Sequence, residues 1–119
     1  MYLFICQNDS FVKLFKENYE QNKSHLNYEA KFIPLLHKLI ATDADTAKCQ
    51  NDILNEIKSL GNDFQIVNVC SNDIGSLYHF FHTVSKIFET NGIEDAKIHF
   101  CNVDINDSDC IDKTIKSFS

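Results

Sequence analysis

The sequence predicts a single α/β domain with a four-stranded, mainly parallel sheet and helices on both faces. Its 119 residues suit one domain that buries its own core, spanning residues 1–119. Short apolar runs alternate along the chain with longer stretches whose apolar residues recur at helical spacing. Strands joined by connections of helical length pair in parallel, because a tight hairpin cannot link them.

The first strand and helix are expected within residues 2–20. Residues 2–6 form a continuous apolar run, which is typical of a strand covered on both faces. Phe11, Phe15 and Tyr19 then recur at helical spacing, and Asp9 or Ser10 is expected to cap this helix. A polar connection is predicted at residues 21–25.

The second strand is predicted at residues 26–32, where apolar and polar residues alternate. The alternative that this stretch begins the next helix remains open. Pro34 disfavours helix across the residue before it and fits the first turn of a following helix instead. Apolar residues continue at helical spacing beyond it: Leu35, Leu36, Leu39 and Ile40.

A second helix is expected to begin near Thr42 or Asp43 and to end at Gly61–Asn62 with a left-handed cap. The third strand is predicted at residues 64–70, which form the next apolar run. A helix over 74–90, capped by Asp73, follows and ends at Asn91–Gly92. Its predicted apolar face comprises Leu77, Phe80, Phe81, Val84, Ile87 and Phe88.

The fourth strand is expected at residues 96–103, followed by a last helix capped by Ser108 or Asp109. Right-handed crossovers and a switch point beside the first strand predict the spatial order 2-1-3-4, as in a trimmed flavodoxin-like or Rossmann-like fold. The first, third and fourth strands would then be neighbours, and their carboxyl ends would meet at one edge of the sheet.

These three strand ends each lead through a cysteine into Asn and Asp residues. The predicted order therefore gathers a polar, negatively charged edge, which we call the carboxylate rim: Asp9, Asn72, Asp73, Asp104, Asn106, Asp107 and Asp109. Three interpretations are open. The side chains can be helix caps and turn formers, they can bind a divalent ion, or they can form a face that binds another protein.

The charge favours a basic protein partner. The formal net charge is −6, and all 11 cationic side chains are lysine. Arginine is the preferred residue for bidentate hydrogen bonds to phosphate and guanine, so its absence in an acidic chain argues against nucleic-acid binding. Only three glycines are present and none forms a phosphate-binding loop, so no dinucleotide or other cofactor is expected.

The cysteines and the first residues predict a cytoplasmic protein. The five cysteines include no C-x-x-C pair, so we expect neither a zinc ribbon nor a thioredoxin-type motif, and the thiols are expected to be reduced. The first residues lack the basic region of a signal peptide, and no apolar run reaches membrane-spanning length. Two further interpretations concern other residues: a reactive thiol at Cys6, Cys70 or Cys101, and a metal-binding pair of His79 and His82, for which a packed or half-exposed pair is the alternative.

In small size, acidity and absence of an export signal or catalytic motif, the whole chain resembles bacterial immunity proteins, such as those paired with toxins of contact-dependent growth inhibition systems. The resemblance implies a non-enzymatic inhibitor that covers the active site of a basic toxin, most simply a nuclease. The rival is a small enzyme or receiver-like domain that binds a divalent metal at the rim. The layout is similar to that of response-regulator receiver domains, but only Asp9 is acidic after the first strand, and Cys70 stands where a phosphoacceptor Asp is expected.

Overall fold

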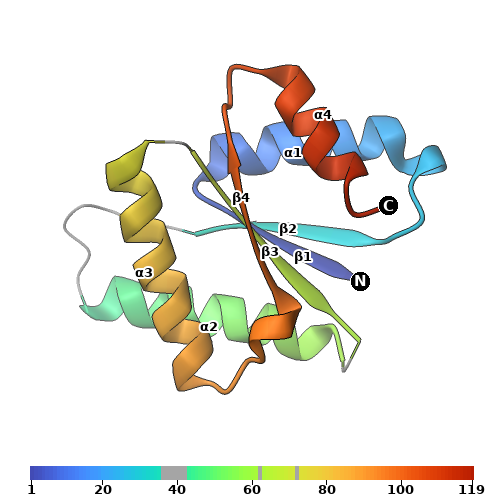
Figure 1. Cartoon of the computed structure of the whole chain (residues 1–119). Coiled ribbons are helices and arrows are strands. Elements are labelled where there is room, and N and C mark those ends of the chain that lie inside the picture. Colours follow the sequence, from blue (N-terminus) through green and yellow to red (C-terminus); the bar gives the residue numbers. More distant parts are fainter. Residues whose placement is uncertain (36–42, 62, 72) are drawn as a thin grey trace.

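Four parallel strands form one sheet in the order β2-β1-β3-β4, which confirms the predicted fold class (Figure 1). The computed structural model describes residues 1–35, 43–61, 63–71 and 73–119. The expectations for Leu36, Leu39, Ile40, Thr42, Asn62 and Asn72 fall outside these residues. The strands are β1 (Tyr2–Cys6), β2 (Ala30–Pro34), β3 (Gln65–Ser71) and β4 (Ile98–Val103).

Two pairs of helices cover the two faces of the sheet. Helices α1 (Asp9–Asn22) and α4 (Ser108–Lys116) lie on one face, and α2 (Asp43–Ser59) and α3 (Ile74–Thr90) lie on the other (Figure 1). Because successive strand residues point to opposite faces, the strands contribute to two separate cores. Leu3, Ile5 and Ile66 face α2 and α3, whereas Phe4 and Val67 face α1 and α4.

The second strand lies later in the sequence than its alternation predicts. Residues 26–29 lie outside β2, and the Tyr28 hydroxyl instead donates a 2.6 Å hydrogen bond to the carbonyl of Ile115 in α4. The expectation that Pro34 belongs to a helical first turn is wrong, because Pro34 ends β2 and pairs with Cys6. Proline has no N–H to donate, and a strand at the sheet edge tolerates that loss.

The helix ends follow the expected chemistry but not always the expected residue. Asn8, and not Asp9 or Ser10, caps α1 by accepting a 3.1 Å hydrogen bond from the Phe11 N–H. Gly61 and Gly92 adopt positive φ angles of 76° and 68°, which confirms the predicted left-handed C-terminal caps. The expected connection at 21–25 is helical, because α1 continues to Asn22 and a 3₁₀ turn, η1 (Lys23–His25), follows.

A second 3₁₀ turn, η2 (Asp95–Lys97), shortens the fourth strand at its start. None of the helices in the described part of the chain combines the length and apolar character needed to span a membrane.

Candidate functional site

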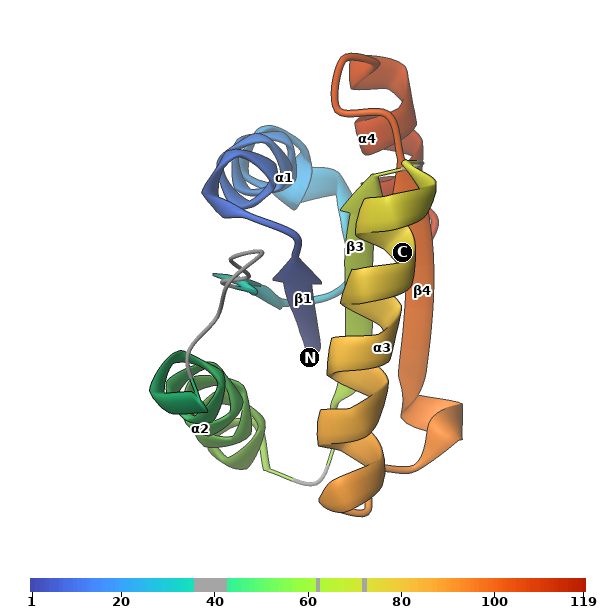
Figure 2. The ribbon, with the colours of Figure 1, turned by 90° about the vertical axis from the view of Figure 1, so that its left-hand side faces the viewer.

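The described residues of the carboxylate rim all follow the carboxyl ends of β1, β3 and β4. Asp9 begins α1, Asp73 precedes α3, and Asp109 lies in the first turn of α4. The register pairs Cys6, the last residue of β1, with Val69, and pairs the last residues of β3 and β4, Ser71 and Val103, with each other, so the three parallel strands end at the same edge of the sheet. Figure 2 shows β1, β3 and β4 running in the same direction, with α3 alongside β3 and β4. The rim residues therefore share one end of the sheet.

The rim is divided between the two faces of that end. Asp9 and Asp109 begin the helices of one face, whereas Asp73 precedes a helix of the other (Figure 1). Within residues 1–35, 43–61, 63–71 and 73–119, no group of three or more His, Cys, Asp or Glu side chains is placed to hold a metal ion.

Two rim aspartates hold the loop between β4 and α4. The Asp107 carboxylate accepts hydrogen bonds from the N–H groups of Asp109 (3.0 Å) and Cys110 (3.3 Å), so Asp107 caps α4. The expectation that Ser108 or Asp109 caps this helix is wrong, because α4 already begins at Ser108 and both residues lie inside it. The Asp104 carboxylate accepts from the N–H of Asn106 at 3.0 Å and so fixes the turn before the cap. The structural interpretation is thus confirmed for Asp104 and Asp107.

Gln7 joins the ends of β1 and β3, a role that the sequence did not indicate. Its side-chain oxygen accepts from the Ser71 N–H at 2.9 Å and from the Cys70 thiol at 3.3 Å. The backbone N–H of Gln7 donates a hydrogen bond to the Val69 carbonyl at 3.0 Å. Its only sequence signal is its place directly after an apolar run. These three bonds fix the position at which the chain leaves β1 toward Asp9.

Asp9 and Asp109 remain negatively charged groups that face solvent. Within the described part of the chain, neither carboxylate takes part in a hydrogen bond or an ion pair. The Asp73 carboxylate lies over the first turn of α3, where its Oδ2 atom would be 3.6 Å from a Cβ placed on Gly75. Ion pairs elsewhere, such as Lys116–Asp112 at 2.9 Å, do not neutralise these positions.

The thiols near the rim are poorly suited to nucleophilic chemistry. Cys6 and Cys70 are buried and Cys101 is partly buried, and all are free thiols. Burial raises the pKa of each of the three above its ordinary value. At Cys70 a hydrogen bond from the Ser71 backbone opposes this increase without cancelling it. Because the thiolate is the nucleophile, raised pKa values favour the interpretation that these cysteines are inert core residues.

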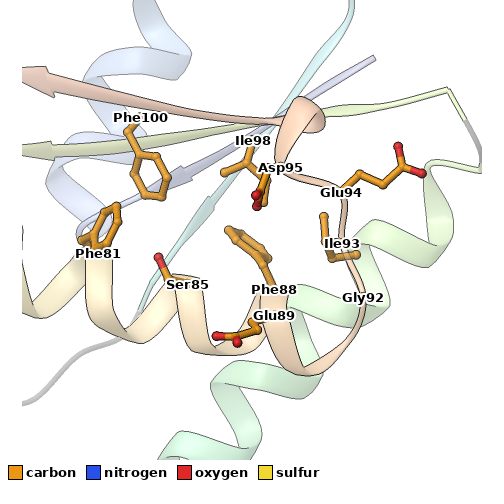
Figure 3. Close-up of a pocket in the computed structure, with 10 residues that line it drawn as sticks. All are labelled: Phe81, Ser85, Phe88, Glu89, Gly92, Ile93, Glu94, Asp95, Ile98 and Phe100. Atoms are coloured by element: carbon orange, nitrogen blue, oxygen red, sulfur yellow. The ribbon is translucent and has the colours of Figure 1, made fainter.

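A groove between α3 and β4 was not predicted from the sequence. Phe81 and Phe100 are 50% and 42% exposed, and their ring centroids lie 4.9 Å apart. The expectation that Phe81 belongs to the buried face of its helix is wrong, because β4 is the last strand and leaves this side chain without a sheet residue beyond Phe100. The groove encloses about 720 Å³ (Figure 3). His82, proposed as half of a metal pair, stacks on Tyr78.

The comparisons with known proteins add no family to this geometry. No protein-family model matches the chain, and no curated protein or solved structure matches it either.

Proposed function

We propose that this chain is a non-enzymatic inhibitor that binds a basic protein through the carboxylate rim, as an immunity protein neutralises its toxin, with a nuclease as the simplest partner. The observation that carries the proposal is the pair of solvent-facing carboxylates at Asp9 and Asp109, held by helix starts whose backbone is already capped by other side chains. Fixed negative charges of this kind complement the basic cleft in which a nuclease binds phosphates.

The division of roles within the rim supports binding. Asn8 and Asp107 satisfy the first N–H groups of α1 and α4. Asp9 and Asp109 are therefore not required as caps, and their charges are available to a partner at no cost in helix hydrogen bonds. Helices α1 and α4 pack together on one face, so the two carboxylates approach a partner from the same face.

The overall charge supports the same partner class. A net charge of −6 attracts a basic protein over distances of about one Debye length, roughly 8 Å at physiological salt. We therefore expect the association rate to fall steeply as salt is added, while the dissociation rate changes less.

The proposal is tested by capturing the partner. The tagged protein is expressed in its native cells, and proteins that it retains at low salt are identified. We expect a basic protein that stops growth when it is expressed alone in a host and that is harmless when this chain is expressed with it. Capture of a partner whose toxicity this chain does not relieve would contradict the inhibitor proposal.

Paired variants then test the face. The double variant Asp9→Asn/Asp109→Asn removes two rim charges and leaves both caps in place. The matched control Asp52→Asn/Asp63→Asn removes two exposed charges on α2 and before β3. We expect the rim variant to slow association about fivefold at low salt and the control to slow it less than about twofold. Equal effects would show that net charge alone matters and that the rim is not the binding face.

A further inference from the structure

The two edges of the sheet are built differently. The β2 edge carries Pro34, which has no N–H, and Lys31, whose ammonium pairs with Glu56 at 3.7 Å. Proline and lysine are the residues with which proteins block unwanted strand addition. The β4 edge, with the sequence Ile-His-Phe-Cys-Asn-Val, carries neither. Its outer backbone has no strand partner in the described part of the chain, so this edge is open to pairing.

An apolar groove accompanies the open edge. Phe81 and Phe100 face each other at one end, Phe88 forms the floor between α3 and β4, and Ile93 and Ile98 follow toward the other end (Figure 3). A volume of about 720 Å³ is enough for one or two large side chains. An exposed aromatic pair beside an unpaired strand is an arrangement that marks protein interaction sites.

The far end of the groove is acidic. Glu89, Glu94 and Asp95 line it, and Figure 3 shows the Asp95 carboxylate turned into the space between β4 and α3, with Glu89 and Glu94 turned outward. Within the described residues none of the three forms an ion pair. The nearby Lys97 ammonium instead lies 4.5 Å from the centre of the Phe64 ring. None of the described residues that line the groove is a lysine or a histidine.

The acidic end of the groove indicates the charge of its occupant. Glu89, Glu94 and Asp95 line this end, and a second copy of this chain, with its net charge of −6, would add further negative charge beside them. Opposite charges favour association and like charges oppose it, so the complementary occupant is a basic segment.

We propose that the α3–β4 groove binds an extended, basic segment of a partner protein, which adds to β4 as a further strand. One apolar side chain of the segment packs against Phe81 and Phe100, and a lysine or arginine faces Asp95. Backbone pairing supplies affinity, and the aromatic pair and the acidic end supply selectivity. The proposal goes beyond the carboxylate rim, because it requires a basic polypeptide and does not require that polypeptide to be a toxin.

A synthetic peptide tests the proposal without knowledge of the natural partner. The probe is an end-blocked peptide of about eight residues that alternates lysine with valine and phenylalanine, the length of a typical strand. Binding is measured by titration calorimetry, and the site is mapped from amide chemical shifts. We expect shifts on β4 and on the second half of α3. Phe81→Ala and Phe100→Ala should each weaken binding about tenfold, and Asp95→Asn about threefold.

Matched controls separate this site from general charge and from the rim. Tyr78→Ala removes an exposed aromatic of the same helix that does not line the groove, and Glu17→Gln removes an exposed charge of α1, on the opposite face of the sheet. Both should leave peptide binding unchanged, as should Asp9→Asn. A peptide with glutamate in place of lysine should not bind. The aromatic variants are checked for folding by their thermal transitions.

Several results would overturn the proposal. They are the absence of peptide binding, equal binding of the glutamate peptide, and affinity that Phe81→Ala and Asp95→Asn leave unchanged. Chemical shifts confined to β2 would place the segment at the wrong edge. A dimer in sedimentation that Phe100→Ala dissociates would show that a second copy occupies the groove.

Discussion

Two variants of Asp107 can separate the contribution of its helix cap to stability from the contribution of its negative charge. Its carboxylate accepts hydrogen bonds from the N–H groups of Asp109 and Cys110 at the start of α4. Asp107→Ala removes both bonds and the negative charge, whereas Asp107→Asn keeps an acceptor in the same place. Asn and Asp are equally good N-caps, so the two variants differ mainly by the cap.

The magnitudes follow from the geometry. Loss of the cap costs about 1 kcal/mol, and loss of a negative charge at a helix N-terminus costs about 0.5 kcal/mol. The expected decrease in the free energy of unfolding is therefore about 1.5 kcal/mol for Asp107→Ala and about 0.5 kcal/mol for Asp107→Asn. The effect reaches the whole fold, because α4 buries Ile111 and Ile115 against the core.

Thermal and urea unfolding measure the difference. For a domain of this size, about 1 kcal/mol changes Tm by about 4 °C, so we expect a decrease of about 6 °C for the alanine variant and about 2 °C for the asparagine variant. Equal losses in the two variants would refute the reasoning, since the charge and not the hydrogen bonds would then support the helix. The asparagine variant can afterwards be used in binding assays, because it removes a rim charge and retains the loop.

Three further predictions concern Asn68 and Tyr28. Asn68 is 1% exposed and donates from Nδ2 to the His99 carbonyl at 3.1 Å, but its Oδ1 atom has no partner among the described residues. Asn68→Val should therefore raise the free energy of unfolding, measured in urea, by about 1 kcal/mol. A decrease would show that the hydrogen bond from Nδ2 stabilises the fold by more than the unpaired oxygen destabilises it. Tyr28→Phe should lower it by about 1 kcal/mol at neutral pH, because the bond to the Ile115 carbonyl is lost, and an unchanged value would contradict that role. Burial, and secondarily the nearby Tyr19 and Tyr2, raise the pKa of Tyr28 above 10.0, so the folded state holds this proton more tightly than the unfolded state. Stability should therefore decline in the wild type above about pH 10, and less so in Tyr28→Phe; parallel pH profiles would refute this.

The sheet order was predictable because it depends on features that the sequence states directly. The apolar runs at β1, β3 and β4 are separated by helical stretches, and right-handed crossovers then leave few arrangements. The shift of β2 was not predictable from alternation, because the Tyr28 ring packs beside Tyr2, with centroids 5.0 Å apart, and beside Tyr19. Tyr28, which the local pattern assigned to a strand, therefore belongs to an aromatic cluster whose members are distant in the sequence.

The carboxylate rim shows that the sequence also leaves the roles of individual side chains undecided. Asn8, Asp9 and Ser10 are all good caps, so composition alone cannot decide which one the helix uses. The choice depends on where β1 ends and on the three bonds that Gln7 makes to the end of β3. Exposure of Phe81 depends on the width of the sheet beneath α3, which helical spacing does not record.

The position of β1 between two later partners shapes how the chain assembles during synthesis. Its neighbours β2 and β3 both follow it in the sequence, so β1 can pair on both sides only after the residues of β3, which end at Ser71, have been synthesised. Each ladder closes a loop of many residues, which makes nucleation slow compared with that of a hairpin protein. Because α1 contacts both β1 and β2 in the folded chain, we expect its early packing to shield the first apolar run from aggregation.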